Sequence, residues 1–295
     1  MRGFFKAIWR QRRRVLTGVF GLLFLGMIFA NSEIGGFEGI PAWALGLGLA
    51  IMAPLIAAPI ILLIMVIPSI RNVIECLVVA LLIEAAILAA FPGLAQTLQA
   101  WDIGAILWLI IWLSVYFFLY GSLSDRLPSW FSYTGRSRFT TTAAPQDVIN
   151  AATPTPDAEE AYYTGAMEYL GPDPLEEDSF NVRYNIGESL YEHQRITILE
   201  HQPGKRCRYY FMGDVSAKNA DFAEGVFDVT ATALPNGKTR VEIVEERPHL
   251  RLRHALWNWF DDSVADGADA LRAKLEGRRD WSFSGRFWRK VAKLA

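Results

Sequence analysis

The histidines are the side chains best suited to catalysis or metal binding, and in this sequence they are scattered. His193, His201, His249 and His254 do not show the HxxxH or HExxH spacing, and the chain has no CxxC motif. A metal site needs ligands that converge, which such short regular spacings provide. We therefore expect no metal site, no cofactor and no set of catalytic residues, and the sequence favours a non-enzymatic role.

The two cysteines and two of the tyrosines are expected in apolar surroundings. Cys76 falls in an apolar segment and Cys207 in a predicted strand, so no disulfide is expected and Cys207 is interpreted as a core side chain. Tyr184 and Tyr209 fall on the buried face of predicted strands, where their hydroxyls need hydrogen-bond partners. Backbone carbonyls or a ligand could supply these partners.

One acidic residue, Glu84, lies deep in an apolar segment with no lysine or arginine at a matching depth. An ionised carboxylate there would cost on the order of 3 kcal/mol. We expect it to be protonated, or to accept hydrogen bonds from a side chain of the next apolar segment: Ser114, Tyr116, Trp108 or Trp112. Two interpretations stay open, a structural polar contact or proton and ion handling. Glu75 is expected to reach the membrane interface without a special role.

Four apolar segments have lengths near the roughly 20 residues that cross a bilayer core. They are Val15–Ala30, Ala42–Ile67, Val73–Phe91 and Ile103–Gly121. The first has the basic start of a signal peptide, but it lacks one of the two small residues that a cleavage site requires. Residues 1–121 are therefore predicted to be a membrane domain of four transmembrane helices.

Positive charge predicts the orientation of these helices. It falls at the amino end, at Arg71, and after the fourth segment at Arg126, Arg136 and Arg138. The positive-inside rule makes that side cytoplasmic. We expect an integral protein of the plasma membrane, the inner membrane in a bacterium, with both termini and the soluble domain in the cytoplasm. No basic stripe crosses the globular part, so nucleic acid is not an expected partner.

The second apolar segment carries a ridge of small residues. Ala42, Gly46, Ala50, Pro54 and Ala58 recur at every fourth position. A ridge of this kind allows another helix to approach closely. Packing within the four-helix bundle and an interface with a membrane-protein partner both explain it.

The second half of the chain has the pattern of an α+β domain. A linker over residues 122–135 leads to a predicted strand over residues 136–143, a short helix and a series of strands with alternating apolar and polar residues. Such alternation is typical of antiparallel strands with one buried face. Apolar positions every three to five residues then predict one long helix, Arg251–Gly277. Residues 136–277 are thus predicted as an antiparallel sheet wrapped on a long C-terminal helix.

This order of elements resembles the helix-grip fold of the START / polyketide-cyclase superfamily (SRPBCC). Three stretches resemble that family: Arg138–Val148, Lys238–Ile243 and Asp266–Gly277. The acidic region Thr153–Asp178 and the membrane anchor depart from its usual pattern. The resemblance implies a cavity between sheet and helix that holds an apolar molecule such as a lipid, and it supplies no catalytic residue because the family has no shared catalytic motif.

The candidate residues for lining this cavity are the inward positions of the strands and of the last helix. They are Tyr184, Ile198, Tyr209, Phe211, Phe227, Val229, Val241, Ile243, Leu256, Trp259 and Leu271. Our first hypothesis is a membrane-anchored protein that binds a hydrophobic small molecule or lipid. The alternatives are an accessory or assembly subunit of a larger membrane complex, and an enzyme of cyclase or aromatase type.

The tail, residues 278–295, is predicted to be a basic amphipathic helix. It carries a net charge of +5, and the first fourteen residues of the chain carry six positive charges. Aromatic and basic faces on one short helix are typical of contact with anionic lipid. Membrane lipids are therefore the expected partners of Arg286, Trp288, Arg289, Lys290 and Lys293. A disordered basic tail or a helix docked on another protein would have the same composition.

Overall fold

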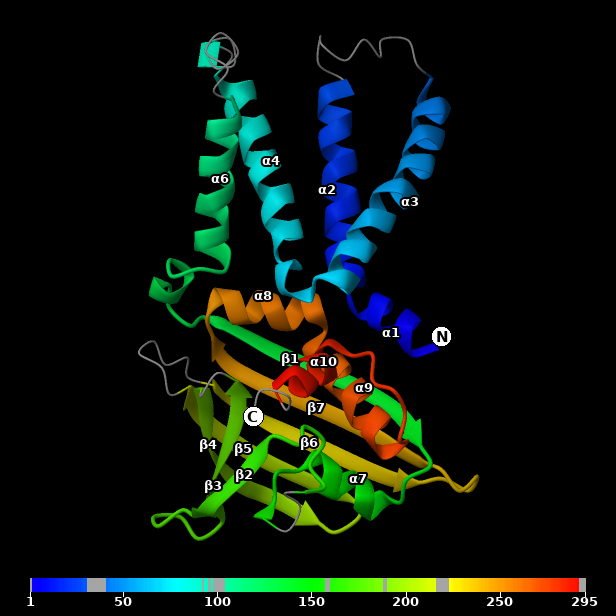
Figure 1. Cartoon of the computed structure of the whole chain (residues 1–295), viewed down its shortest axis with the longest axis vertical. Coiled ribbons are helices and arrows are strands. Elements are labelled where there is room, and N and C mark those ends of the chain that lie inside the picture. The colour runs from blue at the N-terminus through cyan, green and yellow to red at the C-terminus, as the bar shows by residue number, and fades with distance from the viewer. Residues whose placement is uncertain are drawn as a thin grey trace. The chain divides into compact units, whose positions relative to one another are not determined.

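The structure is a computed structural model that describes residues 2–30, 41–91, 93–94, 97, 104–156, 160–187, 190–215 and 223–291. The chain forms two compact units (Figure 1). Residues Gln11–Pro128 form one, here called the helical unit. Met1–Arg10 and Ser129–Ala295 form the other, here called the sheet unit.

The helical unit is built from long apolar helices. They are α2 (Arg12–Ala30), α3 (Ala42–Val66), α4 (Val73–Ala90) and α6 (Gly104–Leu119), with short 3-10 turns η1 (Pro68–Ile70) and η2 (Ser124–Arg126). Three stretches of the described chain are long and apolar enough to cross a membrane: Gly46–Val66, Pro68–Ala90 and Gly104–Arg126. This confirms three of the four expected spans as long apolar helices. The crossing of α2 stays a prediction.

Glu75 does not reach an interface, and our expectation for it was wrong. Its carboxylate accepts hydrogen bonds from Arg14 Nε, 3.0 Å away, and from the hydroxyl of Tyr120. Arg14 Nη1 also donates to Gln11 Oε1 at 2.9 Å. These side chains are buried, so α2, α4 and α6 are joined by one polar cluster. A buried charge is tolerated there because a partner of opposite charge satisfies it.

Glu84 is half-buried in α4 and makes no hydrogen bond with the residues that the structure describes. Ser114 donates instead to the carbonyl of Ile110 at 2.8 Å. Trp112 Nε1 is buried without an acceptor among the described residues. The expected donors on the next helix therefore do not hold Glu84, and the choice between a structural and a proton-handling role stays open.

The small-residue ridge on α3 does not pack within the described part of the bundle. Gly46, Ala50, Pro54 and Ala58 are all exposed, while the side chain of Ala42 lies outside the described residues. The packed part of α3 lies near its other end, where Ile64 is buried. The described part of the bundle therefore does not account for the ridge, and the choice between the two interpretations stays open.

The sheet unit contains one seven-stranded antiparallel sheet with the order β1-β7-β6-β5-β4-β3-β2. Strands β2 to β6 each pair with the next strand in the sequence, as expected for hairpins, whereas β1 pairs with β7 and lies at the opposite edge from β2. The strands are β1 (Phe131–Thr141), β2 (Met167–Pro172), β3 (Ser179–Gly187), β4 (Leu190–Gln202), β5 (Arg206–Val215), β6 (Ala223–Ala233) and β7 (Thr239–Leu250). The first strand begins inside the segment expected to be a linker.

The long C-terminal helix is in fact two helices, which corrects the expected fold. They are α8 (Leu252–Asp261) and α9 (Ser263–Leu275), separated by Asp262 in the left-handed conformation, with φ 51° and ψ 50°. Aspartate visits this conformation more readily than most residues. The Asp262 carbonyl accepts the amides of Ala265 and Asp266 at 2.9 Å each, so the break also starts α9.

Three further helices complete the sheet unit: α7 (Pro145–Ala152), α10 (Phe283–Val291) and α1 (Arg2–Arg10). The inner face of α9 packs on the sheet through Val264, Ala268 and Leu271, which are nearly fully buried. The outer face carries an acidic stripe, defined here as Asp262, Asp266 and Asp269. Steps of four and three residues place these carboxylates on one side of the helix. The stripe holds α1 and α10.

Candidate functional site

A small cavity, called here the chamber, lies between the sheet and the inner face of α9. It has a volume of about 170 Å³. Its lining combines apolar side chains of the sheet, α7 and α9 with a few polar ones: Ala152, Tyr163, Phe227, Ile243, Glu245, Arg247, Ser263, Val264, Gly267, Ala268, Leu271 and Ser284. A mostly apolar lining with a few polar groups is typical of small-molecule sites.

The charged end of the chamber is formed by Arg247 and Glu245 of β7. Arg247 Nε donates to the Glu245 carboxylate, and its guanidinium carbon lies 5.4 Å from the centre of the Phe211 ring. Burial lowers the pKa of Arg247, but the charge and hydrogen bond of Glu245, together with Glu192 and Tyr163, outweigh burial, so the pKa is raised. Within the described chain, Nε makes the only hydrogen bond of this guanidinium. The remaining N–H groups can donate to a ligand.

Four tyrosines gather beside the chamber: Tyr162, Tyr163, Tyr184 and Tyr209. The rings of Tyr162 and Tyr163 lie 5.1 Å apart, and those of Tyr162 and Tyr184 lie 6.1 Å apart. Burial raises the pKa of each hydroxyl above its usual value. These hydroxyls therefore stay protonated and neutral at physiological pH, so they act as hydrogen-bonding groups and not as bases.

A second cavity, called here the vestibule, lies between α9, α10 and the turn before β2. Its volume is about 570 Å³, and it is lined by Tyr163, Thr164, Gly165, Ala270, Lys274, Arg278, Arg279, Asp280, Gly285, Trp288 and Arg289. Tyr163 lines both the vestibule and the chamber. The two spaces are therefore neighbours, with Tyr163 between them.

Nine of the eleven predicted cavity residues lie together in the hydrophobic core beside the chamber. Phe227, Ile243 and Leu271 of this group line the chamber itself. Leu256 and Trp259 are separated from this cluster because they lie on α8, beyond the break at Asp262, and Trp259 is 47% exposed. That the eleven residues bind a ligand stays a prediction.

The sequence interpretation missed Arg247, Glu245, Tyr163 and Ser284. The signal for two of them was present, because Val241, Ile243, Glu245 and Arg247 follow each other at every second position of one strand. That period places them on one face of the sheet. A charged side chain is normally a sign of solvated surface, although the inward face of β7 continues through Glu245 and Arg247.

Helix α10 contains most of the predicted membrane-surface residues. Trp288 packs inward, with its ring 6.4 Å from that of Tyr184, whereas Phe287 is 47% exposed. Arg286 donates to the carbonyl of Trp281 at 3.2 Å, and Lys290 is exposed. Lys293 lies outside the described residues. Contact of the basic side chains with lipid stays a prediction.

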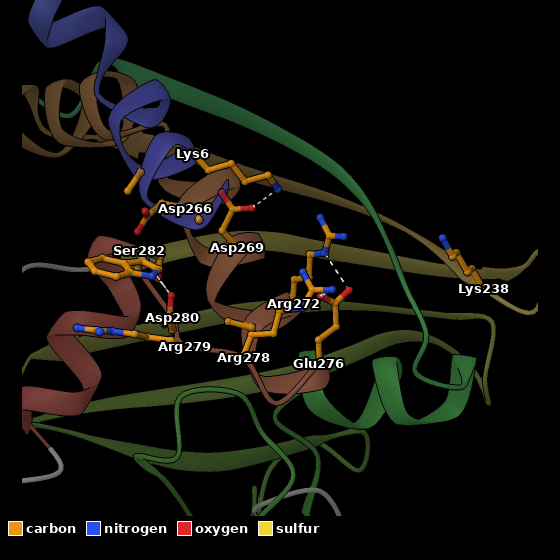
Figure 2. A pocket seen from close by; sticks show the side chains of 14 residues that line it. Lys6, Lys238, Asp266, Asp269, Arg272, Glu276, Arg278, Arg279, Asp280 and Ser282 are labelled. Carbon is orange, nitrogen blue, oxygen red and sulfur yellow. Dashed lines mark hydrogen bonds and ion pairs between the residues drawn. The ribbon is translucent and has the colours of Figure 1, made fainter. Parts of the chain in front are cut away.

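A third cavity, of about 780 Å³, lies between α1, α9 and residues 278–282 (Figure 2). Its charges are largely paired with each other. Lys6 lies 3.0 Å from Asp269, and Arg272 lies 3.0 Å from Glu276, as the dashed lines in Figure 2 show. Lys238 lies far from the other cations in this view. The paired and dispersed charges do not form a focused ligand site.

The described residues contain no group of three or more histidine, cysteine or acidic side chains placed to bind a metal ion. Both cysteines are free and buried. In Cys207, burial raises the pKa of the thiol to about 11, so it is not a thiolate nucleophile at neutral pH.

An antiparallel seven-stranded sheet that packs against a helix near the end of the chain is a helix-grip-like arrangement. No family model matches this sequence, and no curated protein matches it. Solved structures are similar over about half of the chain. Mll3558 from Rhizobium loti is 14% identical with a TM-score of 0.38, covering 49% of this chain and 97% of that one.

Two further similar structures belong to plainly different proteins. Ara h 8.0201 is 10% identical with a TM-score of 0.38, covering 50% of this chain and 97% of that one. DynU16, a protein of the dynemicin biosynthetic locus, is 13% identical with a TM-score of 0.32, covering 51% of this chain and 50% of that one. At these identities and scores, ligand and activity have to be inferred from the residues of this chain.

Proposed function

We propose that this chain is a membrane-anchored binding protein that holds an apolar ligand with a hydrogen-bond acceptor at one end. The ligand occupies the chamber between the sheet and α9. The observation that carries this proposal is Arg247, which brings unused N–H donors to an otherwise largely apolar chamber. The Arg247 side chain is 32% exposed, and hydrogen bonds from a charged donor are stronger than those from a neutral one. A carboxylate, phosphate or carbonyl group at the end of an apolar ligand would accept them.

The polar groups of the chamber support binding and not catalysis. Arginine does not lose its proton in proteins, so Arg247 is not a general base. The neutral tyrosines hold their protons too tightly for that role, because burial raises their pKa. Glu245, the carboxylate of the lining, is held by Arg247, so we propose that it positions this guanidinium and does not act as the base that general acid–base catalysis requires. No observation favours the cyclase or aromatase alternative.

The size of the chamber restricts its ligand. Its volume of about 170 Å³ is below the roughly 300 Å³ at which drug-sized pockets begin. A short acyl chain or a similarly small apolar molecule fits this space best. A larger ligand needs additional volume, and the adjoining vestibule of about 570 Å³ could provide it.

The contacts of α1 support an anchor that crosses the membrane four times. Lys6 and Arg10 form ion pairs with Asp269 and Asp262, so the amino end and α9 lie on one side of the membrane. The chain between them must then cross an even number of times. Three stretches of the described chain are long and apolar enough. Helix α2, with 19 residues, can supply the fourth crossing.

Labelling with a membrane-impermeant maleimide tests this topology. Phe5→Cys and Leu175→Cys replace exposed residues of the sheet unit, and the two natural cysteines are buried. In sealed vesicles of one orientation, both introduced cysteines should be labelled from the same side. Labelling from opposite sides would contradict the four-crossing anchor.

Equilibrium dialysis of the full chain in nanodiscs tests the ligand proposal. The probe is radiolabelled decanoate, an apolar chain with a carboxylate, and decylamine serves as the matched probe without an acceptor. Empty nanodiscs give the background. Decanoate should bind saturably and decylamine should not. Arg247→Met should weaken decanoate binding about 10- to 100-fold, because a hydrogen bond to a charged group is worth about 1.5–3 kcal/mol.

The matched control is Arg240→Met, which removes an exposed arginine from the same strand. It should leave decanoate binding unchanged. The proposal fails if no probe binds saturably, or if Arg247→Met binds decanoate as well as the unaltered protein. Thermal unfolding of each variant shows whether it is folded under the assay conditions.

A second candidate function, an accessory subunit of a membrane complex, is favoured by the exposed ridge on α3. A surface of small residues at Gly46, Ala50 and Ala58 lets another helix pack closely. Ala50→Leu should then release a partner that co-purifies from native membranes, as measured by native mass spectrometry. A lone monomer from the unaltered chain would count against this candidate.

A further inference from the structure

Helix α10 is held to the sheet unit at its first turn. The Asp266 carboxylate accepts the amides of Phe283 and Ser284 at 3.0 and 2.7 Å, and the Ser284 hydroxyl at 2.7 Å. Negative charge at a helix N-terminus is favourable because the unpaired amides point towards it. One residue of the acidic stripe thus fixes the start of α10.

Residues of α10 form walls of both ligand spaces. Ser284 lines the chamber, and Gly285 and Trp288 line the vestibule. Trp288 also packs against the ring of Tyr184, which belongs to the hydrophobic core. Displacement of α10 would therefore remove a wall from the chamber and from the vestibule at the same time.

The opposite face of α10 is basic and aromatic. Phe287, Arg289 and Lys290 are exposed, and the described helix carries no acidic residue. Arg289 is tied by its guanidinium to the carbonyl of Asp280 at 2.8 Å and to its carboxylate at 3.3 Å. Anionic lipid head groups offer the same type of acceptor, and an exposed aromatic side chain favours the bilayer interface.

We propose that α10 is a displaceable cover of the ligand site and that an anionic bilayer surface draws it off. Lipid head groups compete with Asp280 for Arg289, and Phe287 and Lys290 enter the interface. Trp288 then leaves Tyr184, the chamber becomes continuous with the vestibule, and the ligand gains access. This inference rests on the proposed function, because it assigns α10 the control of that same chamber.

The first test measures the cover directly, without a ligand. The full chain is placed in nanodiscs of phosphatidylcholine alone or with phosphatidylglycerol, and hydrogen exchange of residues 283–291 is compared. Anionic lipid should accelerate exchange of these amides at least about tenfold. The double variant Arg289→Gln/Lys290→Gln should lose this acceleration. Equal exchange in both lipids would overturn the proposal.

The matched control removes the same charges elsewhere. Lys205→Gln/Arg240→Gln takes one lysine and one arginine from exposed positions outside α10. It should retain the full response to anionic lipid. If this control loses the response as completely as the α10 variant, general attraction to the bilayer explains the effect, and the proposal is overturned.

The second test measures ligand entry with radiolabelled decanoate. In phosphatidylcholine nanodiscs, Trp288→Ala and a chain ending at Arg279 should both take up decanoate at least about fivefold faster than the full chain. Uptake at the unaltered rate by both would overturn the role of α10 as a cover. If none of the proteins binds decanoate saturably, the proposed function fails, while the exchange experiment still decides whether lipid releases α10.

Discussion

The Arg14 guanidinium and the Glu75 carboxylate lie 3.0 Å apart, with side-chain exposures of 0% and 3%. Glu75 also accepts the hydroxyl of Tyr120, so three helices meet at one carboxylate. A second acidic residue on the same helix, Glu84, is half-buried and has no such partner among the described residues. Of the two carboxylates of α4, Glu75 therefore connects neighbouring parts of the helical unit, whereas Glu84 makes no such contact with the described residues.

Glu75→Ala should strongly destabilise the helical unit. Removal of one partner of a buried ion pair leaves the other charge uncompensated, at a cost of about 3–5 kcal/mol. Tyr120→Phe, which removes one neutral donor, should cost about 1 kcal/mol. Glu84→Ala is the matched control and should cost less than either. The free energy of unfolding of each variant is measured in detergent by circular dichroism. A larger loss of this free energy for Glu84→Ala than for Glu75→Ala would contradict the prediction.

Gly135→Ala should loosen α9 from β1. A methyl group at Gly135 would lie 2.3 Å from Val264 Cγ2 and 2.7 Å from Val264 Cβ. Overpacking of this kind costs about 1–3 kcal/mol. Thr134→Ala at the adjacent exposed position should leave the free energy of unfolding nearly unchanged. Chemical unfolding compares them, and equal stability of both variants would mean that α9 approaches β1 less closely than described.

The attachment of α10 should weaken in mild acid. Burial raises the pKa of Asp266, with a contribution from Asp261, while hydrogen bonds from Ser284 and Phe283 oppose the shift. The folded state therefore takes up this proton at a higher pH than the unfolded state. Protonation of Asp266, as the pH falls through its raised pKa, therefore stabilises the folded state relative to the unfolded state, compared with neutral pH. Protonation nevertheless removes the charge that holds the first turn of α10.

Hydrogen exchange of residues 283–291, corrected for the intrinsic rate, should thus rise at mildly acidic pH. Asp266→Asn, which cannot titrate, should show the faster exchange at every pH. Asp269→Asn, on the same stripe but paired with Lys6, should retain the pH dependence of the unaltered chain. A pH response that survives in Asp266→Asn would assign the effect to another group.

Arg10→Met should release α1 more completely than Lys6→Met. Arg10 pairs with both Asp262 and Asp269 and its side chain is 19% exposed, whereas Lys6 pairs with Asp269 alone among the described residues and its side chain is 46% exposed. Exposed ion pairs contribute about 0–1 kcal/mol to stability. Hydrogen bonds to charged groups contribute about 1.5–3 kcal/mol when the pair is more deeply buried. Chymotryptic cleavage at Phe4 and Phe5 measures release of the helix. Faster cleavage of Lys6→Met would reverse this ranking.

Much of the sheet could be predicted because its signal is local. Alternation of apolar and polar residues indicates the strands, and the turn glycines Gly204 and Gly237, with φ of 64° and 72°, indicate the β4–β5 and β6–β7 hairpins. The break at Asp262 could not be predicted in this way. The apolar spacing runs through it, and its carboxylate is held by Arg10, far away in the sequence.

The candidate site was only partly predictable for the same reason. The period of β7 places Arg247 inward, yet a charged side chain is normally a sign of solvent exposure. Arg247 is only partly buried, with a side chain that is 32% exposed, and it contacts Glu245 and the Phe211 ring from another strand. The role of Glu75 likewise depends on Arg14, 61 positions earlier. Patterns along the chain do not contain such pairings, which only the folded structure brings together.

The ion pair between Lys6 and Asp269 joins residues 263 positions apart. Ribosomes add roughly 5–20 residues per second, so the partner of Lys6 is made about 10–50 s after it. During that time α1 has its basic residues but no acidic stripe, and the apolar helices of the helical unit are made before the stripe exists. Docking of α1 therefore has to wait until α9 has been synthesised.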